Sequence, residues 1–237
     1  MPEKICEEKY NVPAHELPVK PLTIEELEKS SSERVSLIAD EFKRGFEFIK
    51  KYPRSVTFFG SSRFNEENPF YQDARALSKL IVTSLNYAIV TGGGPGIMEA
   101  ANRGAMDADG HSVGLSIKLP REQRTNAYLS DFIDFYYFFS RKVTLSFSAE
   151  AYIFYPGGVG TLDEFFEIFT LVQTHKIACC VPMILVGEAF WKPLDTFIRE
   201  TLYEKMHTIS KEDPDYYLIT DDHKKIVETI RKAPLRI

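Results

Sequence analysis

The chain has 237 residues, of which 44% are hydrophobic, and this length and composition suit one α/β domain with a full core. Its formal net charge is −5 and no basic run stands out, which argues against nucleic acid as a partner. The longest apolar stretch, residues 178–186, is too short to span a bilayer and contains Pro182. We therefore expect neither nucleic acid nor membrane among its partners.

The cysteines and the N-terminus predict the compartment. Cys6, Cys179 and Cys180 do not make a disulfide framework, and we expect them to pack as small hydrophobes without redox or metal chemistry. The first residues are polar and do not form a signal peptide. A cytoplasmic protein is the expectation that follows.

The N-terminal part is predicted to be an arm followed by helices. Four prolines and no steady period characterise roughly the first 20 residues, which predicts an extended arm. A helix is expected from Thr23 or Ile24, and Ser30, Ser31 and Ser32 offer an N-cap for a second helix. That second helix has apolar residues at helical spacing from Val35 to Ile49. We assign residues 1–52 to an arm and helix that pack on the core or on a partner subunit, and residues 53–237 to one catalytic domain.

Strand and helix patterns alternate from there to the C-terminus. Strands are expected at residues 55–59, 87–91, 112–117, 132–138, 151–155, 181–186 and 216–220. Helices are expected around residues 74–85, 97–107, from Ser140 onward, at 165–172, at 190–203 and after Thr220, with Ser140 and Thr220 as N-caps. This alternation predicts a doubly wound, mostly parallel, Rossmann-like α/β sheet with helices on both faces. Ligands bind beyond the carboxyl ends of such strands.

The most informative segment runs from Tyr155 to Glu164, where three glycines stand between a predicted strand and a predicted helix. Unpaired backbone N–H groups and the helix dipole make such a place an anion site, and phosphate is the usual anion. We assign the phosphate to this second glycine loop, residues 156–161, and in particular to Gly157, Gly158, Gly160 and the Thr161 hydroxyl. The structural alternative is a tight strand–helix turn with no ligand. Two carboxylates, Asp163 and Glu164, are expected in the first helical turn, serving the non-phosphate part of the ligand.

The first glycine loop, residues 92–96, follows another predicted strand. Neither loop fits GxGxxG, and GxxxxGK[ST] is absent, so NAD and ATP hydrolysis are disfavoured and a mononucleotide remains. Further candidates for the ribose or the base are Gly92, Gly93, Gly94 and Met98, with Gly60 and Ser61 at the end of the first strand. Close helix–strand packing is the alternative for the first loop. The histidines show no HxH or HExxH spacing, so we expect no metal site.

Three segments in order carry a family resemblance: residues 92–101 (GGGPGIMEAA), the pair Arg141–Lys142, and residues 156–164, which match PGGxGTxxE. The chain resembles the LOG family, the cytokinin riboside 5′-monophosphate phosphoribohydrolases once labelled lysine decarboxylases. The resemblance implies a hydrolase of nucleoside 5′-monophosphates that needs no cofactor and forms dimers or larger assemblies. It implies Glu164 and Arg141 as catalytic residues.

The residues fit that chemistry. Cleavage of an N-glycosidic bond passes through a ribosyl cation, which a carboxylate stabilises while it activates water. Glu164 is our first choice and Asp163 the alternative, although Asp163 also suits a role at the helix dipole. Arg141 binds phosphate or ribose hydroxyls or stabilises the leaving base, and Lys142 reaches the same ligand only near a helix end. The alternative for both is an exposed basic pair.

The sequence departs from the plant-type pattern just before the basic pair. Plant-type members carry Met-His-Glu there, whereas this chain has Phe138, Phe139 and Ser140. We therefore expect a broader purine monophosphate substrate, AMP above all. The aromatic residues 135–139 are expected in the core or an interface, with one able to stack on a base. A non-catalytic nucleotide or phosphorylated-cofactor carrier is the second hypothesis. Lysine decarboxylation is disfavoured because nothing marks a lysine for pyridoxal phosphate.

Overall fold

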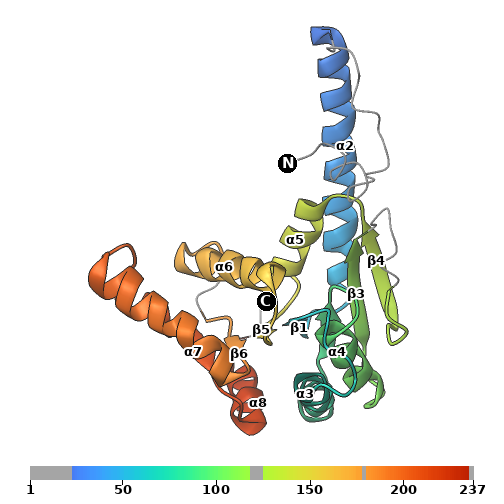
Figure 1. The fold of residues 1–237 in the computed structure, drawn as a ribbon. Coiled ribbons are helices and arrows are strands. Elements are labelled where there is room, and N and C mark those ends of the chain that lie inside the picture. Colours follow the sequence, from blue (N-terminus) through green and yellow to red (C-terminus); the bar gives the residue numbers. More distant parts are fainter. Residues whose placement is uncertain (1–22, 118–124, 178–179, 235–237) are drawn as a thin grey trace, which may run out of the picture.

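The computed structural model describes residues 23–117, 125–177 and 180–234, so the predicted N-terminal arm, Cys6 and Cys179 lie outside the described residues. Seven strands form one sheet in the order β4-β3-β2-β1-β5-β6-β7 (Figure 1). Their bounds are Ser55–Phe59 (β1), Ala88–Thr91 (β2), Ser112–Ile117 (β3), Asp131–Phe135 (β4), Ala151–Phe154 (β5), Met183–Leu185 (β6) and Tyr217–Ile219 (β7). All six strand pairings are parallel, which confirms the predicted fold class.

The helices cover the two faces of the sheet. Their bounds are Ile24–Ile49 (α2), Pro69–Leu85 (α3), Ile97–Met106 (α4), Phe138–Ser146 (α5), Val159–Gln173 (α6), Glu188–Thr196 (α7), the π-helix Phe197–Lys205 (η1), the 3₁₀ turn Asp213–Asp215 (η2) and His223–Lys232 (α8). One buried cluster joins the sheet to α3, α4 and α8, and the other joins it to α5, α6 and α7. The central strands are buried along their whole length, as parallel strands covered on both faces must be.

The chain winds in opposite directions from the centre of the sheet. From β1 it proceeds outward through β2, β3 and β4, and from β5 it proceeds the other way through β6 and β7. The register pairs Val56 with Ala151 and Phe59 with Phe154, so the carboxyl ends of β1 and β5 lie side by side. This is the topological switch point, where ligands of doubly wound sheets bind.

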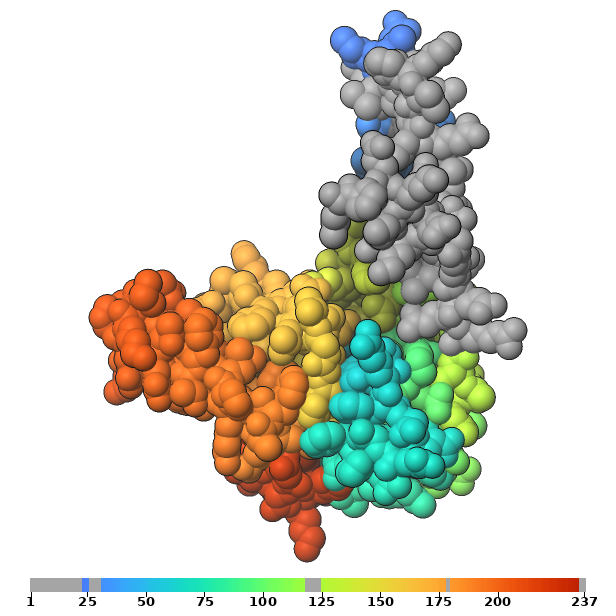
Figure 2. All heavy atoms as spheres, in the orientation of Figure 1, coloured from blue at the N-terminus to red at the C-terminus, as the bar shows by residue number. Residues whose placement is uncertain are grey.

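Helix α2 is one uninterrupted helix, so the prediction that the three serines at 30–32 begin a second helix was wrong. No proline or glycine interrupts the chain there, and Ser36 bonds its hydroxyl back to the carbonyl of Ser32 at 3.0 Å, inside the helix. The helix projects from the body in one direction, and α7 with η1 projects in another (Figure 1, Figure 2).

Two other predicted caps were wrong. The strand expected at residues 132–138 ends at Phe135, and α5 begins at Phe138 with Tyr137 as its N-cap, so Ser140 lies buried inside the helix. Helix α8 is capped by Asp222, whose carboxylate accepts from the backbone N–H of Lys224 at 2.8 Å, and not by Thr220.

Cys180 is exposed, which contradicts the expectation that it packs as a buried hydrophobe. The strand that follows begins only at Met183, so Cys180 lies in the turn before it. Cys180 stands three positions before the buried strand, and its side chain is left on the surface.

Candidate active site

A cavity of about 1090 Å³ lies at the carboxyl ends of the central strands. This volume exceeds that of typical small-ligand sites slightly and leaves room for a mononucleotide. Its walls come from the turn after β1, the first glycine loop with Met98, helix α5, the second glycine loop and the start of α7. The switch point and the glycine loops therefore meet in one cavity, as the sequence predicted.

The N-terminus of α6 opens into this cavity without a cap. Its N-cap is Gly158, which has no side chain, whereas α3 and α8 are capped by the side chains of Asn68 and Asp222. The first N–H groups of a helix have no partner within it, so the start of α6 offers donors and positive potential to an anion. A methyl group added at Gly158 or Gly160 would meet no atom within 4 Å, which leaves the approach to these donors open.

Gly157 has a different role from the other two glycines. A Cβ at this position would collide with the side chain of Thr161, so only glycine lets that hydroxyl lie against the loop. Thr161 is buried, lines the cavity and stands at the third position of α6. Its hydroxyl therefore adds a side-chain donor to the backbone donors of the loop.

The two candidate carboxylates lie one turn deeper than expected. Helix α6 begins at Val159, so Asp163 and Glu164 belong to its second turn, not to its first. Glu164 is partly buried and lines the cavity. The side chain of Asp163 is 60% exposed, is absent from the described lining and forms an ion pair with Lys142 at 2.7 Å. The catalytic roles of both remain predictions, and the placement favours Glu164.

Arg141 is held rigidly in the wall of the cavity. Only 9% of the residue is exposed, and its Nε donates to the carbonyl of Leu115 at 2.6 Å. A Cβ at Gly92 would collide with its guanidinium, so Gly92 provides the space that the arginine occupies. Burial lowers the pKa of Arg141, and the nearby charge of Glu164 works against that change. Arginine side chains keep their positive charge in proteins, so Arg141 brings a cation to the wall of the cavity.

Lys142 points to the outside of the site. Its ammonium lies 2.7 Å from Asp163 and 2.9 Å from Glu167, and it is not part of the described lining of the cavity. This pairing joins α5 to α6. Contact between Lys142 and the ligand remains a prediction, and the geometry instead places its charge among the acidic residues of α6.

Glu164 is the carboxylate in the described lining of the cavity, and its acidity is strongly altered. Burial raises its pKa from 4.5 to about 7, against the opposing effect of Arg141 and Lys142. Asp163 and Glu167 raise the pKa of Glu164 further, because their negative charges disfavour a negative charge on Glu164. A group with a pKa near neutrality is suited to exchange a proton with water or substrate at physiological pH.

The turn after β1 connects the two glycine loops. The N–H of Ser61 donates to the carbonyl of Pro156 at 3.0 Å, and its own carbonyl accepts from Ile97 at 3.0 Å. Gly60, Ser61, Gly92 and Met98 line the cavity as predicted positions, although their contact with a ligand stays a prediction.

Gly93 and Gly94 are not part of the described lining and are fixed by a polar network instead. The Thr91 hydroxyl accepts from Gly93 at 2.9 Å, and the Asn126 side chain donates to the carbonyl of Gly94 at 3.0 Å. Asn126 also donates to Asn102 at 2.9 Å. Gly93 and Gly94 therefore support the site from outside its described lining. Close helix–strand packing remains the alternative role for the first loop.

Sequence reasoning missed most of an aromatic wall. Phe64 and Phe70 stack with ring centroids 5.9 Å apart and line the cavity, and Phe190 of α7 lines it from another side. Phe138, which belongs to the aromatic run noted in the sequence, also lines it and is 61% exposed. No motif marks the other three, because Phe64 comes from the loop after β1, Phe70 from the start of α3 and Phe190 from α7.

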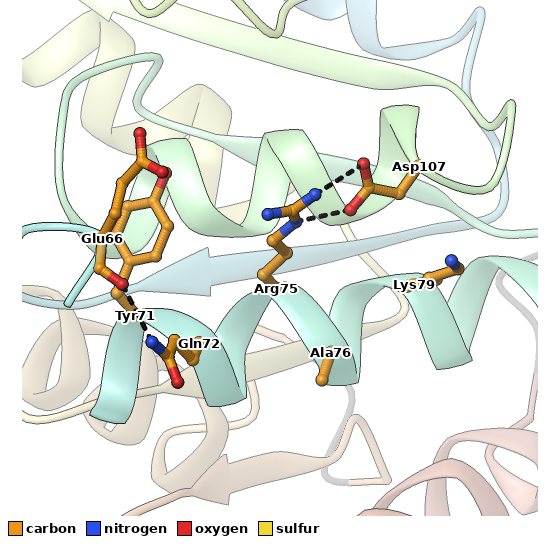
Figure 3. Close-up of a pocket in the computed structure, with 7 residues that line it drawn as sticks. All are labelled: Glu66, Tyr71, Gln72, Arg75, Ala76, Lys79 and Asp107. Atoms are coloured by element: carbon orange, nitrogen blue, oxygen red, sulfur yellow. Dashed lines mark hydrogen bonds and ion pairs between the residues drawn. The ribbon is translucent and has the colours of Figure 1, made fainter. Parts of the chain in front are cut away.

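A second pocket, of about 420 Å³, lies beside α3 and the end of α4 and is lined mainly by polar and charged residues. Figure 3 shows Arg75 directed at Asp107, with two hydrogen bonds of 2.5 and 3.0 Å. Its arginine is already neutralised, so this pocket does not resemble an anion site.

Within the described residues no group of three or more histidine, cysteine or acidic side chains is arranged to hold a metal ion. None of the described helices is both long and apolar enough to cross a membrane.

The fold defines a doubly wound, Rossmann-like α/β protein with a ligand cavity at its switch point. Residues 98–230 match a family model described as "Possible lysine decarboxylase". The chain belongs to this family, the LOG family, as its glycine loops and Arg141–Lys142 pair indicated.

Relatives with assigned activities share a quarter to a third of the aligned residues. The chain is 26% identical, over 64% of its length and 77% of the relative's, to the cytokinin riboside 5′-monophosphate phosphoribohydrolase of Rhodococcoides fascians. It is 29% identical to LOG1 of Arabidopsis thaliana, over 67% and 74% of the two chains. It is 27% identical to the pyrimidine/purine nucleotide 5′-monophosphate nucleosidase of Escherichia coli K12, over 78% of its length but only 42% of that enzyme.

Solved structures share the fold at lower identity. The molybdenum cofactor binding protein of Rippkaea orientalis superimposes with a TM-score of 0.56 at 20% identity, covering 75% of this chain and 95% of that one. The molybdenum cofactor carrier protein of Chlamydomonas reinhardtii gives a TM-score of 0.53 at 18% identity, covering 76% and 96%. At such identities the likeness concerns the fold alone.

Proposed function

We propose that the protein is a nucleoside 5′-monophosphate phosphoribohydrolase, which converts AMP and water into adenine and ribose 5-phosphate. The observation that supports this most is the meeting of Glu164 and Arg141 in one cavity beside the uncapped start of α6. A carrier needs an anion site but does not need a partly buried carboxylate in the wall of the same cavity. The activities of the relatives from Rhodococcoides fascians and Escherichia coli support the same class of substrate.

The mechanism follows from the placement of the charges. The 5′-phosphate binds the N–H groups at the start of α6 and the Thr161 hydroxyl, which orients the ribose toward the second turn of that helix. The bond between C1′ and the base nitrogen breaks, and its electron pair leaves with the base. Glu164, ionised, stabilises the positive charge on C1′ and the ring oxygen and accepts a proton from the attacking water. The water oxygen bonds to C1′, and a proton from water is finally carried by the free base.

Arg141 contributes a fixed positive charge to the same cavity. Its Nε is occupied by Leu115, so the terminal nitrogens are the ones that remain directed toward Gly92 and the ligand. A guanidinium held in this way binds the phosphate or the ribose hydroxyls without losing conformational entropy at each turnover. Asp163 remains the alternative carboxylate, although its exposure and its pairing with Lys142 make it the weaker candidate.

The base is proposed to stack on the aromatic wall. Phe138 precedes Arg141 by three residues and lines the cavity, and this chain has it within the segment where plant-type members carry Met-His-Glu. Aromatic faces stack on any purine, so we propose AMP as the main substrate, with N6-modified adenine nucleotides as further ones. A place in cytokinin biosynthesis and a cytoplasmic location belong to the same proposal.

We also propose a homodimer or larger homo-oligomer. An aromatic surface runs from α2 to α5, where Phe42 contacts Phe139 with centroids 6.4 Å apart and Phe46 contacts Phe147 at 6.1 Å. Phe138, Phe139 and Phe147 are 61%, 48% and 38% exposed, and Phe138 continues the surface to the rim of the cavity. Contiguous apolar surface of this kind is typical of interfaces. Sedimentation at increasing concentration tests this, and a monomer throughout would refute it.

The second candidate is a non-catalytic carrier of a nucleotide or phosphorylated cofactor. The observation that favours it is the fold likeness to molybdenum cofactor binding and carrier proteins. It predicts that a phosphorylated ligand binds tightly and is released unchanged, with Glu164→Gln having no effect on the ligand's fate.

One experiment separates the two candidates. Purified protein is incubated with AMP and the products are resolved by chromatography, with Glu164→Gln alongside. Adenine and ribose 5-phosphate from the wild type alone would support the hydrolase and the role of Glu164. An AMP-dependent rise in melting temperature without release of adenine from any monophosphate would refute the hydrolase and leave the carrier.

A further inference from the structure

Helix α2 docks closely on the helix that carries Arg141. Its buried stripe includes Glu41, Gly45 and Phe48, which recur at helical spacing. A Cβ at Gly45 would lie 2.8 Å from the hydroxyl of Thr144 in α5 and 2.9 Å from the ring of Phe135. Only glycine permits this approach, so the contact between α2 and α5 is closer than ordinary side-chain packing.

Glu41 is buried, with 6% of its surface exposed, and all its described hydrogen bonds go to the start of α5. Its Oε1 accepts from the backbone N–H of Tyr136 at 2.5 Å, and its Oε2 accepts from that of Tyr137 at 3.1 Å. Its Oε2 also accepts from the hydroxyl of Ser140 at 2.6 Å. A buried carboxylate is tolerated when hydrogen bonds of this kind satisfy it.

These contacts supply the cap that α5 lacks locally. The N-cap residue Tyr137 makes no side-chain hydrogen bond to the helix, and the carbonyl of Tyr137 accepts from the N–H of Arg141 at 3.3 Å. Glu41 therefore fixes Tyr137, whose carbonyl holds the backbone N–H of Arg141. It also places a negative charge at the positive end of the helix dipole.

We propose that Glu41 is a positioning residue for Arg141, so that the N-terminal helix α2 sets the geometry of the active site. This rests on the proposed function in so far as Arg141 acts on the substrate. It assigns to residues 24–49 a role in turnover that the glycine loops and the Arg141–Lys142 pair do not reveal.

Chemical labelling tests the positioning without relying on activity. The rate at which phenylglyoxal modifies Arg141 is measured by mass spectrometry in the wild type, Glu41→Gln and Ser140→Ala, with the exposed Arg231 as internal reference. Glu47→Gln is the matched control, because Glu47 is an exposed glutamate on the same helix. We expect phenylglyoxal to label Arg141 several-fold faster in Glu41→Gln and Ser140→Ala than in the wild type and in Glu47→Gln. Equal rates in all four proteins would overturn the proposal.

Kinetics with AMP then separates positioning from simple stability. In Glu41→Gln, kcat/KM per folded molecule is expected to fall about tenfold, because Arg141 leaves the position from which it acts on the ligand. Ser140→Ala is expected to show a smaller fall, and Glu47→Gln none. A lower melting temperature with unchanged kcat/KM would show a purely structural contact and refute the positioning role. If the wild type releases no adenine, the proposed function fails while the labelling still decides the case of Glu41.

Discussion

Replacing Glu164 with glutamine is expected to stabilise the folded protein at pH 8 while it removes the activity. The folded pKa of about 7 exceeds the ordinary value of 4.5, so the folded protein binds a proton that the unfolded chain releases between these pH values. The free-energy cost of carrying an ionised Glu164 in the folded protein is therefore nearly absent below pH 4.5. This cost grows as the pH rises and reaches its full value above pH 7. The difference corresponds to at most about 3 kcal/mol, since one pKa unit is about 1.4 kcal/mol.

The measurable effect is smaller than this ceiling, because Glu164 borders an open cavity and water screens its charge. We expect about 1–2 kcal/mol at pH 8, which for a chain of this size raises the melting temperature by roughly 2–8 °C. The gain should shrink to about a quarter at pH 5, as the two pKa values dictate. Differential scanning calorimetry at both pH values measures it, with the exposed glutamate variant Glu200→Gln as the control that should not change. A lower melting temperature at pH 8, or a gain independent of pH, would refute the reasoning.

The remaining predictions concern turnover and binding. Glu164→Gln should lower kcat for AMP by about 10²- to 10³-fold, whereas Asp163→Asn should stay within about threefold, and the reverse order would make Asp163 the catalytic carboxylate. The ratio kcat/KM for AMP, which reports the free enzyme, should rise with pH through a midpoint near 7, because Glu164 must be ionised. Lys142→Gln should move that midpoint to higher pH, since the lysine lowers the pKa of Glu164, and an acid shift would contradict this. Gly160→Ala should raise the melting temperature, because alanine favours a helix by about 1 kcal/mol over glycine, yet raise KM for AMP at least about tenfold by covering the open N–H groups. Unchanged KM in a folded Gly160→Ala protein would move the phosphate away from α6.

The central part of the fold was predictable from periodicity. Strands at 55–59 and 112–117 were placed at their observed bounds, because each is a short β-rich apolar run with a turn signal after it. The start of α5 was not, since Phe138 and Phe139 extend an aromatic run that resembles a strand. What begins the helix there is Glu41, which lies 99 positions from Ser140, and no local pattern reveals a partner so distant.

The candidate site was predictable to the extent that motifs mark it. The second glycine loop, Glu164 and Arg141 share one cavity, and residues with no motif, such as Phe64 and Phe190, complete it. The direction in which a side chain points could not be predicted from the spacing of residues in the sequence. Lys142 follows Arg141 directly, yet it faces the acidic residues of α6 because neighbours on a helix diverge by about 100°.

The pairing of β1 with β5 also governs how the protein is made. Val56 lies beside Ala151 in the sheet, yet nearly a hundred positions separate them in the chain. At a synthesis rate of roughly 5–20 residues per second, one edge of β1 waits about 5–20 seconds on the ribosome for its neighbour. During that interval Phe59, buried in the finished protein, lies along an open hydrogen-bonding edge that invites wrong partners. The site at the switch point is consequently assembled only after most of the chain exists, so variants that slow the docking of β5 should reduce the yield of soluble protein before they affect the activity of the molecules that fold.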